Sequence, residues 1–180
     1  GIENGKWIQL ILTATKLLAL FALIILGIYV GLQKDILSAN FSNMWEASKT
    51  VVHPDGSVTV TKLVGTAILG AATATMINSL FSSDAWNNVT FIAGEIKDPK
   101  KNIPRSLFLG TLIVTVIYVL ANLAYLSLLP MYGTPNSNDV VANGIMFAYN
   151  DRVGAAAASM IMGNTGVFVM TALIMISANA

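Results

Sequence analysis

Four long stretches of this sequence are almost free of charge, and they limit what the chain can fold into. Together they hold only Lys16 and Asp84 of the nineteen charged residues in the chain. Because about 20 consecutive apolar residues cross the hydrocarbon core of a bilayer, each stretch is long enough to form a membrane span. The four stretches are residues 7–32, 63–86, 106–129 and 153–180.

The composition excludes most soluble and catalytic functions. Charged residues make up 11% of the chain, against roughly 25% in an ordinary soluble domain. The formal net charge of +1 provides no basic surface for a nucleic acid. The chain has no Cys and a single His, so neither a thiolate centre nor a His-based metal site is expected. We therefore expect no enzyme, no metal or other cofactor and no nucleic-acid partner.

These features predict an all-α integral membrane protein with about four transmembrane helices, in one domain that covers residues 1–180. The chain does not begin with Met and stops inside an apolar run, so we interpret it as a fragment of a longer multi-pass protein of a plasma or bacterial inner membrane. The predicted spans are residues 7–32, 63–92 with a break near 82–85, 105–129 and 155–180. The connecting loops are residues 33–62, 93–104 and 130–152.

The distribution of Lys and Arg predicts which loops face the cytoplasm. Loop 93–104, counted with its flanks as residues 87–105, contains four basic residues. Loop 130–152 contains one, and the longer loop 33–62 contains three. Short loops rich in Lys and Arg stay in the cytoplasm. We therefore expect loop 93–104 and the N-terminus to be cytoplasmic and the other two loops to be extracellular.

Two patterns predict local structure in the first long loop. Apolar residues between Ile36 and Trp45 have helical spacing, which indicates a short amphipathic helix on the membrane surface. Two strand-like runs flank Pro54-Asp55-Gly56, and such a turn favours a β-hairpin.

Three patterns predict features of the helices themselves. Gly27 and Gly31 have the small-xxx-small spacing that lets two helices approach closely, although a chance pair of lipid-facing glycines fits equally well. Pro104 is placed to begin the helix of the third span. The segment Gly163-Asn164-Thr165-Gly166 weakens the last apolar stretch, so a helical piece is expected before it and a span after it.

Lys16 is the first charged residue inside a predicted span. It lies about 14 Å along the helix from Trp7, near the middle of a hydrocarbon core about 30 Å thick. A tilted helix could still carry its ammonium group to the membrane surface. The other interpretation, which we favour, is that the ammonium faces a cavity or partner carbonyls, because a charge left in lipid is costly.

Asp84 is the second such residue, and it lies where the second span loses its helical character. Serine, aspartate and asparagine follow Phe81 and disfavour a helix interior. A broken helix is tolerated in a membrane only against protein or a water-filled cavity, and broken helices form substrate and ion sites in secondary transporters. Asp84 could equally cap the helix that restarts after it, and Phe81 and Trp86 could be ordinary packing residues.

A longer pattern around this break resembles a known family. The pattern is an aromatic residue, a short polar segment and Trp-Asn at residues 81–88, then Gly94 to Pro99 and Lys101 to Arg105. It resembles the amino acid–polyamine–organocation superfamily, and it is most similar to the L-type amino acid transporter branch and its bacterial homologues. Residues 13–20 resemble the fifth helix of that family.

The resemblance implies a LeuT-type fold, which has twelve helices and two inverted repeats of five. This chain would then hold helices five to eight, the second of its spans being the discontinuous helix six. The same resemblance implies that the loop after helix six is cytoplasmic. The charge distribution indicates the same orientation.

The resemblance also implies roles for particular residues. Lys16 matches a lysine whose ammonium group takes the place of a sodium ion, which implies sodium-independent transport. Phe81 matches an aromatic gate over the site, and Trp86 is assigned to the gate because it flanks the same break. Asp84 occupies a position where many relatives have Gly, and a carboxylate there would favour cationic as well as neutral amino acids. The implied substrate-binding residues are Phe81, Ser82, Ser83, Asp84, Ala85 and Asn87.

The sequence therefore supports an amino acid exchanger or permease that works by alternating access. Its expected partners are an amino acid and the lipid bilayer, and an accessory subunit is left open. An alternative is an amino acid sensor or channel-like protein that reuses the fold without coupled transport. A purely structural helical bundle leaves Lys16 and Asp84 without a role.

Overall fold

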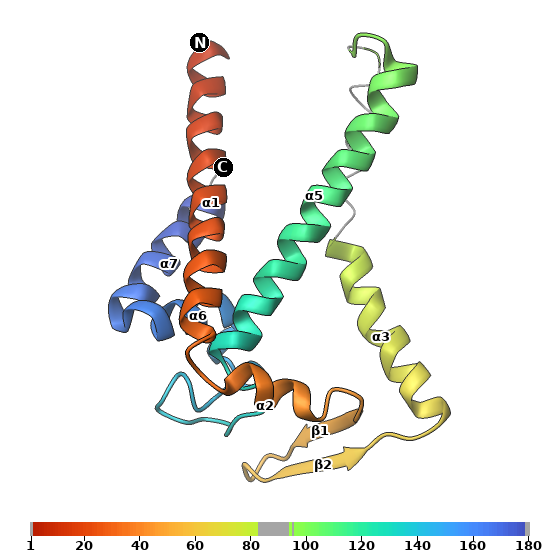
Figure 1. Ribbon diagram of the computed structural model, residues 1–180, viewed down its shortest axis with the longest axis vertical. Helices are drawn as coiled ribbons and strands as arrows, with labels where there is room; N and C mark the ends of the chain where they lie inside the picture. The colour runs from red at the N-terminus through yellow and green to blue at the C-terminus, as the bar shows by residue number, and fades with distance from the viewer. Residues whose placement is uncertain (1, 83–93, 95, 179–180) are drawn as a thin grey trace. The chain divides into compact units, whose positions relative to one another are not determined.

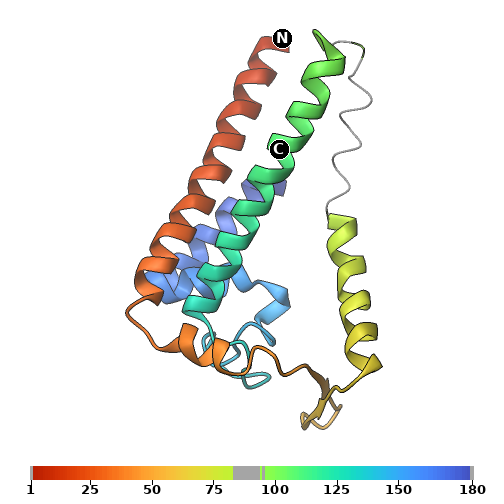
Figure 2. The same ribbon diagram turned by 45° about the vertical axis from the view of Figure 1, so that its right-hand side comes forward.

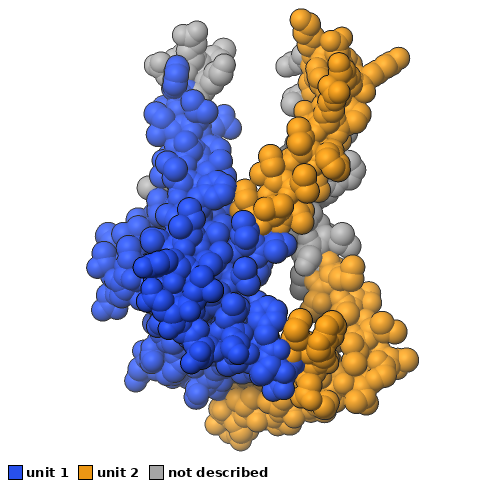
Figure 3. All heavy atoms as spheres, in the orientation of Figure 1, with its two compact units in different colours: residues 1–43, 118–180 blue, residues 44–117 orange. Residues whose placement is uncertain are grey.

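The computed structural model describes residues 2–82, 94 and 96–178 (Figure 1). This part of the chain divides into two units. Unit 1 contains residues 1–43 and 118–180, and unit 2 contains residues 44–117, coloured blue and orange in Figure 3. The helices are α1 (Ile2–Gly31), α2 (Ile36–Ser42), α3 (Thr66–Ser82), α5 (Pro99–Leu128), α6 (Val153–Met162) and α7 (Asn164–Ala178), with strands β1 (Ser48–Val52) and β2 (Val58–Lys62) and a 3₁₀ turn at Tyr149–Asp151.

Two helices of the described part are long and apolar enough to cross a membrane. The segment Trp7–Gly31 of α1 has a mean hydropathy of 2.4, and α5 has a mean hydropathy of 2.2. The other apolar helical segments there, in α3, α6 and α7, are shorter. The described structure is therefore mainly helical, as expected for a piece of a membrane protein. The discontinuity predicted in the second span lies outside the described residues.

Four polar side chains of α5 find hydrogen-bond partners inside the helix itself. Each donates a hydrogen bond of 2.7–2.8 Å to the carbonyl four residues before it. Such bonds allow a hydroxyl or amide group to lie in apolar surroundings without an unpaired donor. The four donors are Thr111, Thr115, Asn122 and Ser127.

The prediction that Pro104 begins this helix is wrong. Helix α5 begins at Pro99, and Pro104 lies inside it. Pro99 already supplies the fixed φ and the missing N–H that suit a first helical position. The carbonyl of Asp98 accepts the N–H groups of Lys101 and Asn102 at 3.0 Å, so the helix is established before Pro104. The ring of Pro104 then removes one hydrogen bond from an early turn.

Gly27 and Gly31 bring α1 close to the C-terminal part of α5 in unit 1. A methyl group at Gly27 would lie 3.0 Å from the Cβ atom of Ala124. A methyl group at Gly31 would overlap the side chain of Ser127. Of the two interpretations that the sequence leaves open for this pair, the structure shows the close helix contact.

Helices α6 and α7 pack beside the second half of α1 (Figure 1). They are separated at Gly163, whose φ of 62° lies in the region that glycine adopts without strain. The predicted weak point at residues 163–166 is therefore confirmed as the end of one helix and the start of another. The buried core of unit 1 consists of residues from α1, α6 and the C-terminal end of α5: Leu23, Leu128, Leu129, Ala156, Ala157 and Ala158.

The predicted hairpin is present in unit 2. Strands β1 and β2 pair antiparallel, with Val52 opposite Val58. The Asp55 carboxylate accepts hydrogen bonds from the hydroxyl and the N–H of Ser57, at 2.7 and 2.9 Å. These two bonds hold the pKa of Asp55 below its usual value, and the bond from the hydroxyl group has the larger effect. Lys62, the last residue of β2, forms an exposed ion pair with Glu46 at 2.9 Å.

We predict that Gly31→Ala destabilises the protein by about 1–3 kcal/mol, because the added methyl group overpacks the contact with Ser127. The matched control is Gly110→Ala on α5, where an added methyl group meets no atom within 4 Å. Thermal unfolding of the purified protein in detergent measures the difference. Equal midpoints for the two variants would contradict the close contact.

Candidate functional site

Lys16 lies on the face of α1 that packs against the rest of unit 1. The less exposed side chains of α1 recur every three or four residues, and they include Ala19, Leu23 and Gly27. Lys16 belongs to this stripe and is half-buried, whereas its neighbours Leu17 and Leu18 are exposed. With 3.6 residues per turn, Lys16 lies about one turn before Ala19 and two turns before Leu23. Its position on the packed face favours a role inside the protein over one in lipid.

The other predicted site residues are placed only in part. Phe81 and Ser82 form the last two residues of α3, in unit 2. Lys16 belongs to unit 1, so each half of the predicted site is described within its own unit. The remaining predicted residues lie outside the described residues; they are Ser83, Asp84, Ala85, Trp86 and Asn87.

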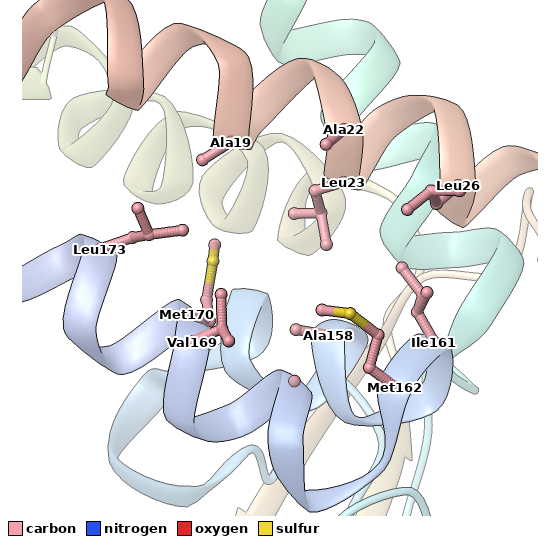
Figure 4. Close-up of a pocket in the computed structure, with 11 residues that line it drawn as sticks. Ala19, Ala22, Leu23, Leu26, Ala158, Ile161, Met162, Val169, Met170 and Leu173 are labelled. Atoms are coloured by element: carbon pink, nitrogen blue, oxygen red, sulfur yellow. The ribbon is translucent and has the colours of Figure 1, made fainter. Parts of the chain in front are cut away.

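An apolar cavity of about 100 Å³ lies between α1 and the α6–α7 pair (Figure 4). Ala19, Leu23 and Leu26 of α1 face Ile161 and Met170 across it. Ligand pockets usually measure about 300–1,000 Å³ and place a few polar groups against the ligand. The lining of this cavity contains no charged side chain. At this size and with this lining, it is a gap in the packing beside the stripe to which Lys16 belongs.

Asn40 joins α2 to the C-terminal end of α5, a contact that sequence reasoning missed. Its Nδ2 group donates to the carbonyls of Leu126 and Leu129, at 2.8 and 2.9 Å. Its Oδ1 atom accepts the N–H of Met131 at 2.8 Å. Both views show α2 lying across this end of α5 (Figures 1 and 2).

The need for Asn40 follows from the sequence at the end of α5. In a continuing helix the carbonyl of Leu126 would accept the N–H of residue 130. Residue 130 is Pro and has no N–H, so the side chain of Asn40 supplies the missing donor. The sequence marks Asn40 as unusual, because it lies in the middle of the apolar face of the amphipathic pattern that starts at Ile36, but it does not identify the partners of its side chain.

Helix α2 is shorter than the amphipathic pattern predicted. It ends at Ser42, and Met44 and Trp45 follow it as exposed residues. The prediction of a short helix in this loop is confirmed, whereas its position on a membrane surface stays a prediction.

The chain therefore has the features of a piece of a helical membrane protein, with a lysine on the packed face of one membrane-length helix. A family model described as amino acid permease matches residues 1–180, so the chain belongs to this family, as the superfamily resemblance implied. The family consists of permeases and not of enzymes. The expectation that the chain is not an enzyme is thereby confirmed.

Curated transporters share this similarity over much of the chain. Identity is 28% over 153 residues with the b(0,+)-type amino acid transporter 1 of Rattus norvegicus, covering 85% of this chain and 26% of that relative. Identity is 27% over 166 residues with the serine/threonine exchanger SteT of Bacillus subtilis (strain 168), and the match covers 92% of this chain and 30% of that relative. Identity is 30% over 128 residues with the large neutral amino acids transporter small subunit 2 of Mus musculus, and the match covers 69% of this chain and 21% of that relative.

The chain thus spans less than a third of the length of these relatives. No solved structure matches the chain significantly. Family membership therefore rests on the sequence similarity.

We predict that Asn40→Ala destabilises the protein by about 1–3 kcal/mol, because it leaves two carbonyls and one N–H group at the C-terminal end of α5 unpaired. The control is Ser38→Ala, an exposed position on the same helix. Both variants are compared by thermal unfolding in detergent. An unchanged midpoint for Asn40→Ala would show that the three bonds contribute nothing.

Proposed function

We propose that the full protein is a sodium-independent secondary transporter of amino acids that works by alternating access. The observation that carries this proposal is the match of the amino acid permease family to residues 1–180. Relatives named as an exchanger and as amino acid transporters support it. The protein would lie in a cell membrane as a multi-pass protein, with residues 93–104 in the cytoplasm and loops 33–62 and 130–152 outside.

The proposed mechanism uses two positions of this chain. The second span would be the discontinuous helix of a LeuT-type fold, with free backbone groups and Asp84 at its break. The ammonium group of the substrate would bind the carbonyls near Phe81 and Ser82, and Phe81 and Trp86 would close over it. Binding would then shift the equilibrium between outward-open and inward-open states, with no covalent chemistry.

Lys16 would supply the fixed positive charge that a sodium ion supplies in coupled relatives. Its half-buried place on the packed face of α1 supports this role, because a charge held against protein groups costs less than one in lipid. A fixed charge in the sodium site would remove the need for sodium.

A partner subunit belongs to the proposal as well. One relative is named as the small subunit of a large neutral amino acids transporter. By analogy, the full protein would assemble with a second subunit.

We predict substrate-stimulated counterflow in liposomes that is unchanged when choline replaces sodium. Lys16→Ala should reduce this flux about 10- to 100-fold, since the ammonium group makes charge-assisted contacts worth about 1.5–3 kcal/mol. Lys34→Ala, at an exposed lysine beyond the end of α1, is the control. Binding of the amino acid without flux would support the sensor alternative, and a requirement for sodium would refute the role of Lys16.

We predict that the full protein accepts arginine through Asp84. Asp84→Asn keeps the shape of the side chain and removes its charge, so arginine uptake should fall about tenfold or more while uptake of a neutral amino acid is retained. Radiolabelled uptake of the two substrates by the same preparation measures this ratio. If the ratio does not change, Asp84 does not pair with the substrate side chain.

A further inference from the structure

We propose that the N-terminal part of α5 forms a binding site for an anionic phospholipid. Four exposed cations, Lys97, Lys100, Lys101 and Arg105, lie at or next to the start of this helix. Within the part of the chain that the structure describes, none of them forms an ion pair. Asp98 is the one carboxylate among residues 96–105, so this segment carries a net positive charge.

Local hydrogen bonds hold the backbone of residues 97 and 98 against the first turn of α5. The Nδ2 group of Asn102 donates to the carbonyl of Lys97 at 2.5 Å, and the carbonyl of Asp98 accepts the N–H groups of Lys101 and Asn102. Lys97 is thereby fixed against the first turn of α5. Cations at a helix N-terminus are not favoured by the helix dipole, so their placement does not serve to stabilise the helix.

An apolar surface continues directly from two of these cations. Lys101, Arg105, Phe108 and Leu112 follow one another at intervals of four, three and four residues, which places them on one face of a helix. Phe108 and Leu112 are 69% and 49% exposed. The face is therefore basic at its first two turns and apolar after them, and a phospholipid with an anionic headgroup has the complementary arrangement.

The depth of the two parts also fits a phospholipid. Along the helix axis, Arg105 lies about 3 Å and Lys101 about 9 Å before Leu107, where the apolar run begins. The headgroup region of one leaflet is about 5–8 Å thick. When α5 crosses a bilayer, as the proposed function requires, these cations lie at the level of lipid phosphates and Phe108 lies beside the acyl chains. A cytoplasmic orientation of this loop requires only its positive charge. A lipid site also requires that the cations and the apolar side chains lie on the same face of α5.

The test measures binding of short-chain phosphatidylglycerol to the purified full protein in detergent, with short-chain phosphatidylcholine as the neutral lipid and inorganic phosphate as the soluble anion. Lys101→Gln/Arg105→Gln should weaken binding of phosphatidylglycerol about 30-fold, or about fivefold for each cation. The matched control, Lys34→Gln/Lys49→Gln, removes the same charge from two exposed lysines elsewhere and should leave binding unchanged. Phe108→Ala should weaken binding of the lipid and not that of phosphate.

Three results would overturn the proposal: equal affinity for both lipids, equal loss in the control variant, or equal affinity for phosphatidylglycerol and inorganic phosphate. A size-exclusion profile shows whether the variants are folded. If the double variant does not fold, a salt titration of the unaltered protein replaces it, and binding that does not weaken with salt refutes the site. The assay contains no amino acid, so a failure of lipid binding and a failure of amino acid transport are read separately.

Discussion

Backbone and side-chain polar groups that lie in apolar surroundings need partners from the chain itself, and this constraint explains much of the described structure. Inside α5 three hydroxyl groups and one amide group bond to carbonyls one turn back. At its end, where Pro130 removes a donor, Asn40 comes from another helix to replace it. Each solution follows from what an unpaired polar group costs away from water, which is about 1–3 kcal/mol in proteins.

Close packing in unit 1 depends on small side chains. Glycine at positions 27 and 31 lets α1 meet α5 almost at backbone contact, and the alanines of α6 let that helix enter the same core. In a membrane such contacts matter more than in water, because lipid chains compete for apolar surface as well as any side chain does. The gap beside Ala19 and Leu23 marks where this packing is incomplete.

Much of this architecture follows from sequence, where a local rule is strong. The Pro-Asp-Gly turn and the weak segment at Gly163 each have one dominant conformational cause, and each is predicted, whereas the sequence leaves the role of the glycine pair open. The start of α5 was misplaced at Pro104 because two prolines compete for the first helical position and Pro99 occupies it. Asn40 was missed because its partners are 86 and 89 residues away, and no local pattern encodes such a distance. For the candidate site, the structure describes only some of the residues that the sequence predicts. Lys16 lies on a packed face, whereas the role of Asp84 stays a prediction.

The bond from Asn40 to Leu126 also joins the two ends of a long excursion of the chain, the segment of residues 41–125. Everything between these residues, including the hairpin and α3, leaves from and returns to one anchor point. A change of length at the exposed turn near Gly56 is therefore taken up within the excursion and leaves the anchor in place. The hairpin can therefore vary in length while α2 and the C-terminal end of α5 remain joined.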